Sequence, residues 1–114
     1  MNIVVTGGLG FIGSAFVRYA SNQGAHCTVI DNMTYAADQS RLNGYNYDLI
    51  LKDICEDVSW ACKDAHYVVN FAAESHVDNS IKDGKPFLKS NVEGTYNMLE
   101  IARQIPTLKR FVQI

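Results

Sequence analysis

The sequence lacks the features that would place the protein in several large classes. None of its 114 residues belongs to an apolar run approaching the roughly 20 residues needed to cross a bilayer. The first residues carry neither a basic segment followed by an apolar stretch nor a signal-peptide cleavage site. Lysine and arginine number 10 against 12 acidic residues, without a basic stripe. We therefore expect a cytoplasmic protein that binds neither membrane nor nucleic acid.

Cysteine is also scarce, at three residues: Cys27, Cys55 and Cys62. An odd number without regular spacing argues against a disulfide-stapled secreted domain. None belongs to a Cys-x-x-Cys pair, and we expect ordinary reduced thiols and no metal site. Repeats, low-complexity stretches and linkers are absent too. With 47% hydrophobic and 19% charged residues, the composition is that of a folded globular domain.

Apolar runs alternate with helical patterns along the whole chain. This alternation predicts βαβ units and the α/β class: a Rossmann-type, doubly wound parallel sheet of about five strands with helices on both faces. Strands are expected at residues 3–6, 27–30, 49–51, 67–71 and 110–114, and helices at about 13–23, 58–63 and 86–105. Because the sequence stops within the fifth apolar run, we expect residues 1–114 to be the N-terminal part of a dinucleotide-binding domain truncated at that strand.

The apolar faces of the two longer helices follow from residues spaced three, four or seven apart. The residues predicted on one face are Ile12, Phe16, Tyr19 and Ala20 in the first helix, and the apolar face of the last comprises Leu88, Val92, Leu99 and Ala102.

A glycine-rich turn joins the first strand to the first helix, with Gly7, Gly10 and Gly13 in G-x-x-G-x-x-G spacing. Gly7 suits a tight turn with positive φ. Gly10 allows a pyrophosphate to approach the backbone, and Gly13 allows the helix to lie close to the sheet. The amides at the helix N-terminus would hold the phosphates. The alternative is a tight turn that binds nothing, whereas a mononucleotide P-loop is excluded because no Gly-Lys-Ser/Thr follows.

Two aspartates follow the second and third strands. Asp31 lies 18 residues after Gly13, where a carboxylate can accept hydrogen bonds from the ribose hydroxyls of the adenosine and repel a 2′-phosphate. Asn32 and Met33 come next and offer no cation, so NAD is favoured over NADP. A solvated aspartate at the strand end is the alternative. Asp53 could accept from the adenine amino group or cap a turn, and the sequence favours neither.

Several segments resemble a known family. Residues 6–13 resemble the opening of the extended short-chain dehydrogenase/reductases, and residues 70–81, Asn-Phe-Ala-Ala-Glu-Ser-His-Val-Asp-Asn-Ser-Ile, resemble the dTDP-glucose 4,6-dehydratases. Residues 31–36, 53–55 and 91–95 are similar to this group as well. The chain departs from the group at Asn79, where many relatives carry Arg, and in its short 53–66 segment.

The resemblance implies a set of residues that contact NAD or the substrate. They are Phe11 and Ile12 at the pyrophosphate; Asp31, Asn32, Met33 and Thr34 at the adenosine ribose; Asp53 and Ile54 at the adenine; Phe71, Ala72, Ala73 and Glu74 on the nicotinamide side; Ser90 near NAD; and Ser75 near both cofactor and sugar substrate. His76 and Asp78 belong to the same loop as Ser75, without an implied role.

The resemblance further implies an NAD-dependent nucleotide-sugar 4,6-dehydratase, a homodimer as the whole protein, in which NAD is recycled. Relatives carry their Thr/Ser-Asp-Glu and Tyr-x-x-x-Lys catalytic segments after the fifth strand. None of the six tyrosines here has Lys four residues on, so we expect no catalytic residue within the chain. The alternatives are a nucleotide-sugar epimerase or decarboxylase, a non-catalytic NAD-binding module, and an NAD sensor. Since one dimer helix would lie beyond residue 114, the helix at 86–105 is expected to expose an apolar strip.

Overall fold

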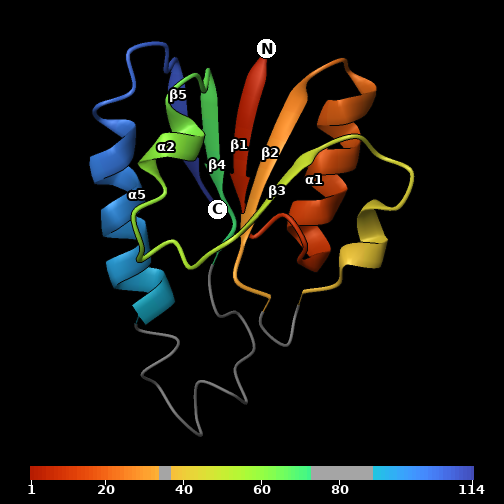
Figure 1. Cartoon of the computed structure of the whole chain (residues 1–114), viewed down its shortest axis with the longest axis horizontal. Coiled ribbons are helices and arrows are strands. Elements are labelled where there is room, and N and C mark those ends of the chain that lie inside the picture. Colours follow the sequence, from red (N-terminus) through yellow and green to blue (C-terminus); the bar gives the residue numbers. More distant parts are fainter. Residues whose placement is uncertain (34–36, 73–88) are drawn as a thin grey trace, which may run out of the picture.

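Five parallel strands form a single sheet in the order β3-β2-β1-β4-β5. The computed structural model describes residues 1–33, 37–72 and 89–114, with only the backbone of residues 89 and 90. All strand arrows point toward one edge in Figure 1. The strands are β1 (Asn2–Thr6), β2 (His26–Asp31), β3 (Asp48–Leu51), β4 (Tyr67–Asn70) and β5 (Arg110–Gln113). The predicted Rossmann-type parallel sheet is thus confirmed, with strand bounds that differ by a residue or so.

The central strand β1 is buried because it packs on both faces of the sheet. Alternate side chains of a strand point to opposite faces, and Ile3 and Val5 join one buried cluster while Val4 joins the other. Neighbouring strands continue both clusters, with Val69 of β4 on the first side and Val68 on the second. Such strands read as continuous apolar runs, which explains why they could be located from sequence.

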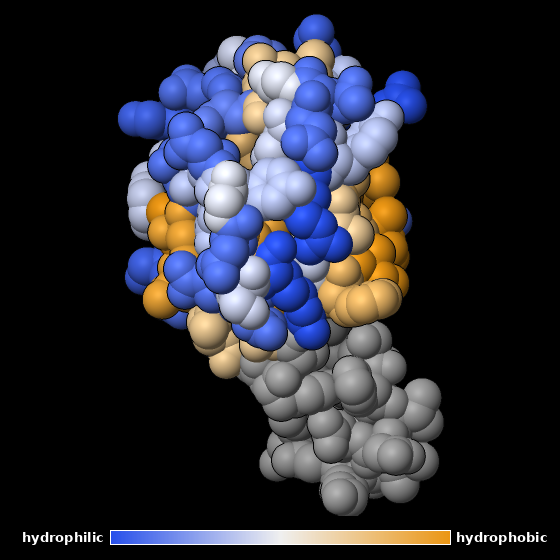
Figure 2. Space-filling view, turned by 90° about the vertical axis from the view of Figure 1, so that its right-hand side faces the viewer, coloured by the Kyte–Doolittle hydropathy of each residue, from blue (hydrophilic) through white to orange (hydrophobic). Residues whose placement is uncertain are grey.

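Helices cover both faces of this sheet (Figure 1). On one side lie α1 (Phe11–Asn22) and the short 3₁₀ helix η1 (Gln39–Leu42). On the other lie α2 (Ser59–Cys62) and α5 (Thr95–Ala102), which follows the π-helical turn η2 (Lys89–Gly94). Figure 2 shows that hydrophilic side chains cover most of the outer surface on the α1 side.

The buried face of α1 differs from the prediction. Ile12 and Tyr19 are exposed, Phe16 is partly buried, and Ala20 is buried as expected. The helix begins at Phe11, two residues before the predicted start. Its buried residues are Gly13, Ser14, Val17 and Ala20. The sequence pattern missed this face because two of its buried residues, Gly13 and Ser14, are small and not strongly apolar.

The last helix also differs in its buried face. Val92 and Leu99 are exposed and Ala102 is buried, while the large buried side chain is that of Met98. The predicted start near Pro86 and the residue Leu88 lie outside the described residues. Val92, Tyr96 and Leu99 are spaced four and three apart and form an exposed apolar strip on this helix, as expected.

The carboxyl ends of all strands meet at one edge of the sheet (Figure 1). The chain runs outward from β1 in two directions, to β2 and β3 on one side and to β4 and β5 on the other. Ligands of such sheets bind beyond the carboxyl ends where the strand order reverses, here between β1 and β4. In the described part of the chain, no helix is long and apolar enough to cross a membrane.

Candidate dinucleotide-binding site

The glycine-rich turn leaves β1 in a conformation that requires glycine at its first position. Gly7 has φ +69°, and a Cβ there would lie 2.8 Å from the amide nitrogen of Ala72. The amide of Gly10 then donates to the carbonyl of Gly7 at 3.1 Å, and the amide of Ser14 donates to the carbonyl of Gly10 at 3.0 Å to start α1. The positive φ predicted at Gly7 is confirmed, and the turn lies against the segment after β4.

Gly10 differs from its two partners because its surroundings are open. Its φ is −74°, and among the described residues other than its chain neighbours the one heavy atom within 4 Å of a Cβ there, the Gly7 oxygen, would be 3.3 Å away. As the N-cap of α1 it provides no side-chain hydrogen bond to the first helical amides, which have no partner within the helix. The turn thus presents uncapped amides and a backbone without Cβ, the arrangement that an anion at a helix N-terminus requires.

Gly13 is required for a reason other than the predicted one. A Cβ at Gly13 would collide with the carbonyl oxygen of Gly7 and lie 3.1 Å from the Cα of Gly8. The close approach is between the helix and its own turn. Contact with the sheet instead involves Gly8, where a Cβ would lie 2.7 Å from Cγ1 of Val29. No role was assigned to Gly8 from the sequence, although its position directly after Gly7 in the glycine-rich turn could have indicated one.

Asp31 connects the end of β2 to the glycine-rich turn. Its Oδ2 accepts a hydrogen bond from the amide of Leu9 at 3.0 Å, and its Oδ1 accepts from the amide of Met33 at 2.9 Å. The residue is only 6% exposed, so it is not the solvated aspartate of the alternative reading. Met33 follows with φ +58°, a conformation that costs on the order of 1 kcal/mol in a non-glycine residue. The Asp31 carboxylate thus holds both the turn and the backbone that follows β2.

Leu9 is held from its other side by the segment that contains η1. Its carbonyl accepts from the amide of Asp38 at 2.9 Å and from the Arg41 guanidinium at 2.8 Å. Arg18 of α1 in turn donates to the carbonyl of Arg41 at 3.1 Å. Hydrogen bonds from a charged donor are among the stronger ones in proteins. Arg41 therefore braces the glycine-rich turn, a role that no sequence motif indicated.

A buried polar pair lies where β1 and β4 end. The hydroxyl of Thr6 donates to Oδ1 of Asn70, its partner in the strand register, and both residues are fully buried. Nδ2 of Asn70 donates to Oε1 of Gln113 at 2.8 Å, and the amide of Ala72 donates to Oγ1 of Thr6 at 3.3 Å. Buried polar groups are retained where they are fully hydrogen-bonded. This network fixes the strand ends at the reversal point of the sheet.

Phe71 and Ala72 lead away from β4 over the turn. The amide of Phe71 donates to the carbonyl of Thr6 at 3.0 Å, and its ring packs on Phe16 with centroids 5.7 Å apart. Both residues are partly buried and each packs against one of the two buried clusters. The structure therefore brings the segment expected on the nicotinamide side into contact with the glycine-rich turn, with the Phe71 ring packed on Phe16 of α1.

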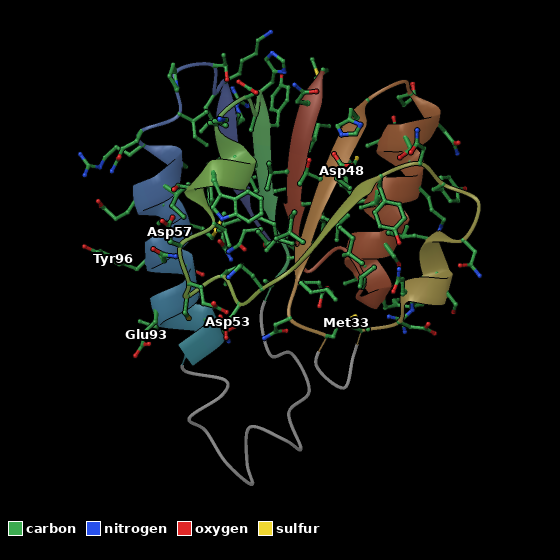
Figure 3. The ribbon with its side chains drawn as sticks, viewed as in Figure 1. Met33, Asp48, Asp53, Asp57, Glu93 and Tyr96 are labelled. Atoms are coloured by element: carbon green, nitrogen blue, oxygen red, sulfur yellow. The ribbon has the colours of Figure 1, made fainter. Side chains whose placement is uncertain are left out.

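Asp53 and Ile54 form part of a turn after β3. Oδ1 of Asp53 accepts from the amide of Cys55 at 2.8 Å, so Asp53 does cap a turn, and its Oδ2 is the remaining acceptor. Ile54 is buried against the second cluster. The turn is joined to the rest of the edge because the amide of Lys52 donates to the carbonyl of Asp31 at 3.1 Å. Met33 and Asp53 lie along the same edge of the molecule in Figure 3.

Several predicted site residues fall outside the described residues: Thr34, Ala73, Glu74 and Ser75, together with His76, Asp78 and Asn79. Ser90 is described by its backbone alone, within η2. The described site residues converge on the carboxyl ends of β1, β2, β3 and β4.

Two of the three cysteines, Cys27 and Cys62, lie away from this edge of the sheet. Cys27 and Cys62 are fully buried in opposite clusters. Burial raises the pKa of the Cys62 thiol to about 11 and raises that of Cys27 as well. Both therefore remain protonated near neutral pH and act as small apolar groups. Within the described residues, no cluster of histidine, cysteine, aspartate or glutamate is arranged to hold a metal ion.

A parallel sheet that reverses its strand order above a glycine-rich turn defines a dinucleotide-binding domain of the Rossmann type. The chain belongs to the NAD dependent epimerase/dehydratase family, whose model matches residues 3–114. NAD is the cofactor that gives this family its name.

Individual relatives support the assignment. The chain is 44% identical over 112 residues to a probable dTDP-glucose 4,6-dehydratase of Sinorhizobium fredii, and the aligned region covers 91% of this chain and 32% of that protein. Among solved structures, dTDP-glucose 4,6-dehydratase from Streptomyces venezuelae with NAD bound has a TM-score of 0.90 at 32% identity, over 97% of this chain and 38% of that one. UDP-glucose 4-epimerase from Thermotoga maritima has a TM-score of 0.91 at 29% identity, and the match covers 99% of this chain and 37% of that one. The chain spans about a third of the length of the curated relatives it matches.

Proposed function

We propose that this chain is the NAD-binding part of a nucleotide-sugar 4,6-dehydratase that acts on dTDP-glucose. The observation that carries this function is its similarity to dTDP-glucose 4,6-dehydratases, at 42–44% identity across about nine tenths of the chain. The expected product is the 4-keto-6-deoxy sugar nucleotide. The residues at the carboxyl edge of the sheet support the cofactor part of this function.

The site fits NAD at three points. The space over Gly10, which a Cβ would fill, and the uncapped amides of α1 suit the pyrophosphate. Each oxygen of Asp31 accepts one amide and keeps a further lone pair for a ribose hydroxyl. The partly buried backbone of Phe71 and Ala72 would line the nicotinamide side. A carboxylate at Asp31, followed by Asn32 and Met33, favours NAD over NADP, whose 2′-phosphate it would repel.

Bound NAD supplies a hydride acceptor that becomes a hydride donor within one catalytic cycle, so that it is regenerated. The residues of this chain bind and orient it: the turn holds the phosphates, Asp31 orients the ribose, and Thr6 with Asn70 keeps the strand ends aligned. Ala73 and Glu74 are proposed on the nicotinamide side and Ser75 near both cofactor and sugar, with Thr34 and Ser90 as further contacts to NAD. Proton transfer to and from the sugar is assigned to residues outside this chain.

A product assay on the whole protein tests the function. Incubation with dTDP-glucose, without added reductant, should yield the 4-keto-6-deoxy product while NADH does not accumulate. Stoichiometric formation of NADH would contradict a dehydratase cycle.

A nucleotide-sugar 4-epimerase is the second candidate, because epimerases are among the solved structures that resemble the chain. A decarboxylase of the same family is a related alternative. Parallel assays with dTDP-, UDP- and GDP-sugars separate these reactions by product: an inverted hydroxyl, a lost carboxyl group or a 4-keto-6-deoxy sugar.

The 114-residue chain itself is proposed to bind NAD without turnover, and a whole protein that lacked a Tyr-x-x-x-Lys segment would instead be a sensor of NAD. Detectable turnover by the purified chain would contradict the first statement. For the whole protein we further propose a cytoplasmic location and a homodimer. The exposed strip of Val92, Tyr96 and Leu99 supports the dimer.

A further inference from the structure

We propose that Asn97 of α5 is a positioning residue that sets the adenine selectivity of the cofactor site. It acts through the turn at residues 53–56, which we call the adenine turn. This inference rests on the proposed NAD site, because the contact between this turn and adenine is part of that proposal. Asn97 belongs to none of the segments implied to touch the cofactor.

The adenine turn is closed by its own hydrogen bonds. The amide of Cys55 donates to Oδ1 of Asp53 at 2.8 Å, the amide of Glu56 donates to the Asp53 carbonyl at 2.9 Å, and the amide of Asp53 donates to Oε1 of Glu56 at 3.2 Å. These bonds fix the shape of the turn. They do not fix where the turn lies relative to the sheet, because each begins and ends within the turn.

Asn97 connects the turn to α5, in addition to the hydrogen bond from the amide of Lys52 to the carbonyl of Asp31 that joins it to β2. Its Nδ2 donates to the carbonyl of Ile54 at 2.6 Å and to the carbonyl of Glu56 at 2.7 Å. Only the amide nitrogen, with two hydrogens, can face two carbonyl oxygens at once, so the orientation of this side chain is determined by chemistry. Both carbonyls are more than 40 residues away in sequence, and the bonds therefore join the turn to the helix that follows β4.

Close packing beside Asn97 strengthens this connection. A Cβ at Gly94, one helical turn earlier, would lie 2.5 Å from Cδ1 of Ile54. Ile54 is 4% exposed and packs in the same buried cluster as Met98, the neighbour of Asn97. The adenine turn thus rests directly on the helix surface, and the two hydrogen bonds from Asn97 fix its position on that surface.

The consequence for recognition is chemical. Adenine carries an exocyclic amino group that donates hydrogen bonds, and Asp53 has one carboxylate oxygen, Oδ2, beyond the one used in the turn. Hypoxanthine carries a carbonyl oxygen in place of that amino group and would face the carboxylate with an acceptor. Discrimination between the two bases therefore depends on how firmly the turn is held.

The test compares the affinity of the whole protein for NAD and for nicotinamide hypoxanthine dinucleotide by calorimetry. Wild type should prefer NAD. Asn97→Ala should weaken NAD binding about tenfold through loss of the two hydrogen bonds and bring the ratio of the two affinities close to one. Asn97→Asp, whose carboxylate would face and repel the two carbonyl oxygens, should weaken NAD binding more than Asn97→Ala does. The matched control is Gln104→Ala, an exposed amide beyond the end of α5, which should leave both affinities unchanged.

An unchanged affinity ratio in folded Asn97→Ala would overturn the inference, since a purely structural role would weaken both dinucleotides alike. If that variant fails to fold, Asn97→Ser, which keeps a hydroxyl donor, gives the same readout with a smaller loss. Failure of the wild type to bind either dinucleotide would overturn the proposed NAD site itself. Wild-type binding without any preference for NAD would overturn the adenine role of the turn.

Discussion

Substitution of Gly10 by alanine separates cofactor binding from stability. Within the part of the chain that the structure describes, the new methyl group has one non-adjacent neighbour within 4 Å, the carbonyl oxygen of Gly7 at 3.3 Å, and the backbone φ of −74° is one that alanine adopts freely. A shift of a few tenths of an ångström accommodates it. Replacing glycine also reduces the freedom of the unfolded chain, which stabilises by about 0.4–1 kcal/mol. We expect the free energy of unfolding to change by no more than about 1 kcal/mol.

Binding should respond differently, because the same methyl group occupies the space through which a pyrophosphate would approach the uncapped amides of α1. Hydrogen bonds to charged groups contribute about 1.5–3 kcal/mol each. Loss of one or two of them corresponds to about 3 kcal/mol, or a fall in NAD affinity on the order of a hundredfold. Calorimetry for NAD binding and urea unfolding followed by circular dichroism give the two quantities.

Two other glycines provide the controls. Gly13→Ala should fail in both assays, because its Cβ would collide with the Gly7 carbonyl. Gly24 has φ +89° and open surroundings far from the site, so Gly24→Ala should cost about 1–2 kcal/mol of stability and no affinity. A folded Gly10→Ala variant that binds NAD as the wild type does would refute the proposed role of the glycine-rich turn.

Three further predictions concern Arg41 beside the glycine-rich turn, the buried thiol of Cys62, and the exposed apolar strip that contains Leu99. Arg41→Ala removes the hydrogen bond from the guanidinium to the carbonyl of Leu9. We expect the free energy of unfolding to fall by about 1.5 kcal/mol and NAD binding to weaken about tenfold. Arg41→Lys should restore part of both the stability and the affinity. Full affinity in Arg41→Ala would contradict the brace. Burial raises the pKa of the Cys62 thiol from 9.0 to about 11, so the stability that the protonated thiol contributes is complete below pH 9 and is lost as the pH rises toward 11. The difference in unfolding free energy between wild type and Cys62→Ala, measured by urea unfolding, should therefore shrink from pH 9 to pH 11. A difference that stays constant over this range would contradict the raised pKa. Leu99→Glu should shift the whole protein toward monomer in light scattering without unfolding it, and an unchanged mass would rule out the strip as the dimer surface.

The fold could be predicted because its strands are buried on both faces and therefore appear as apolar runs. The helix faces were predicted less well, since periodicity of large apolar residues locates a buried face only where side chains fill the contact. In α1 the buried residues include Gly13 and Ser14, and Gly13 lies against the carbonyl of Gly7 in the preceding turn. The large apolar residues Ile12 and Tyr19 consequently lie outside.

The site could be predicted where backbone geometry demands a particular residue type. Gly7 is such a position, as its positive φ shows. The supporting contacts could not be predicted, because Arg41, Asn70 and Asn97 act on groups more than 30 residues away in sequence. Nothing in the local sequence of Arg41 or Asn97 distinguishes these two residues from other polar residues. Their roles follow only from the way the crossovers bring the ends of the strands together.

The central claim is a working NAD site formed by the glycine-rich turn and Asp31. Parallel calorimetric titrations of the 114-residue chain with NAD and with NADP, after circular dichroism confirms folding, test it most directly. Saturable binding of NAD with much weaker binding of NADP is the predicted result, and Asp31→Ala should remove it. Equal binding of the two dinucleotides, or no binding of NAD by the folded chain, would contradict the account.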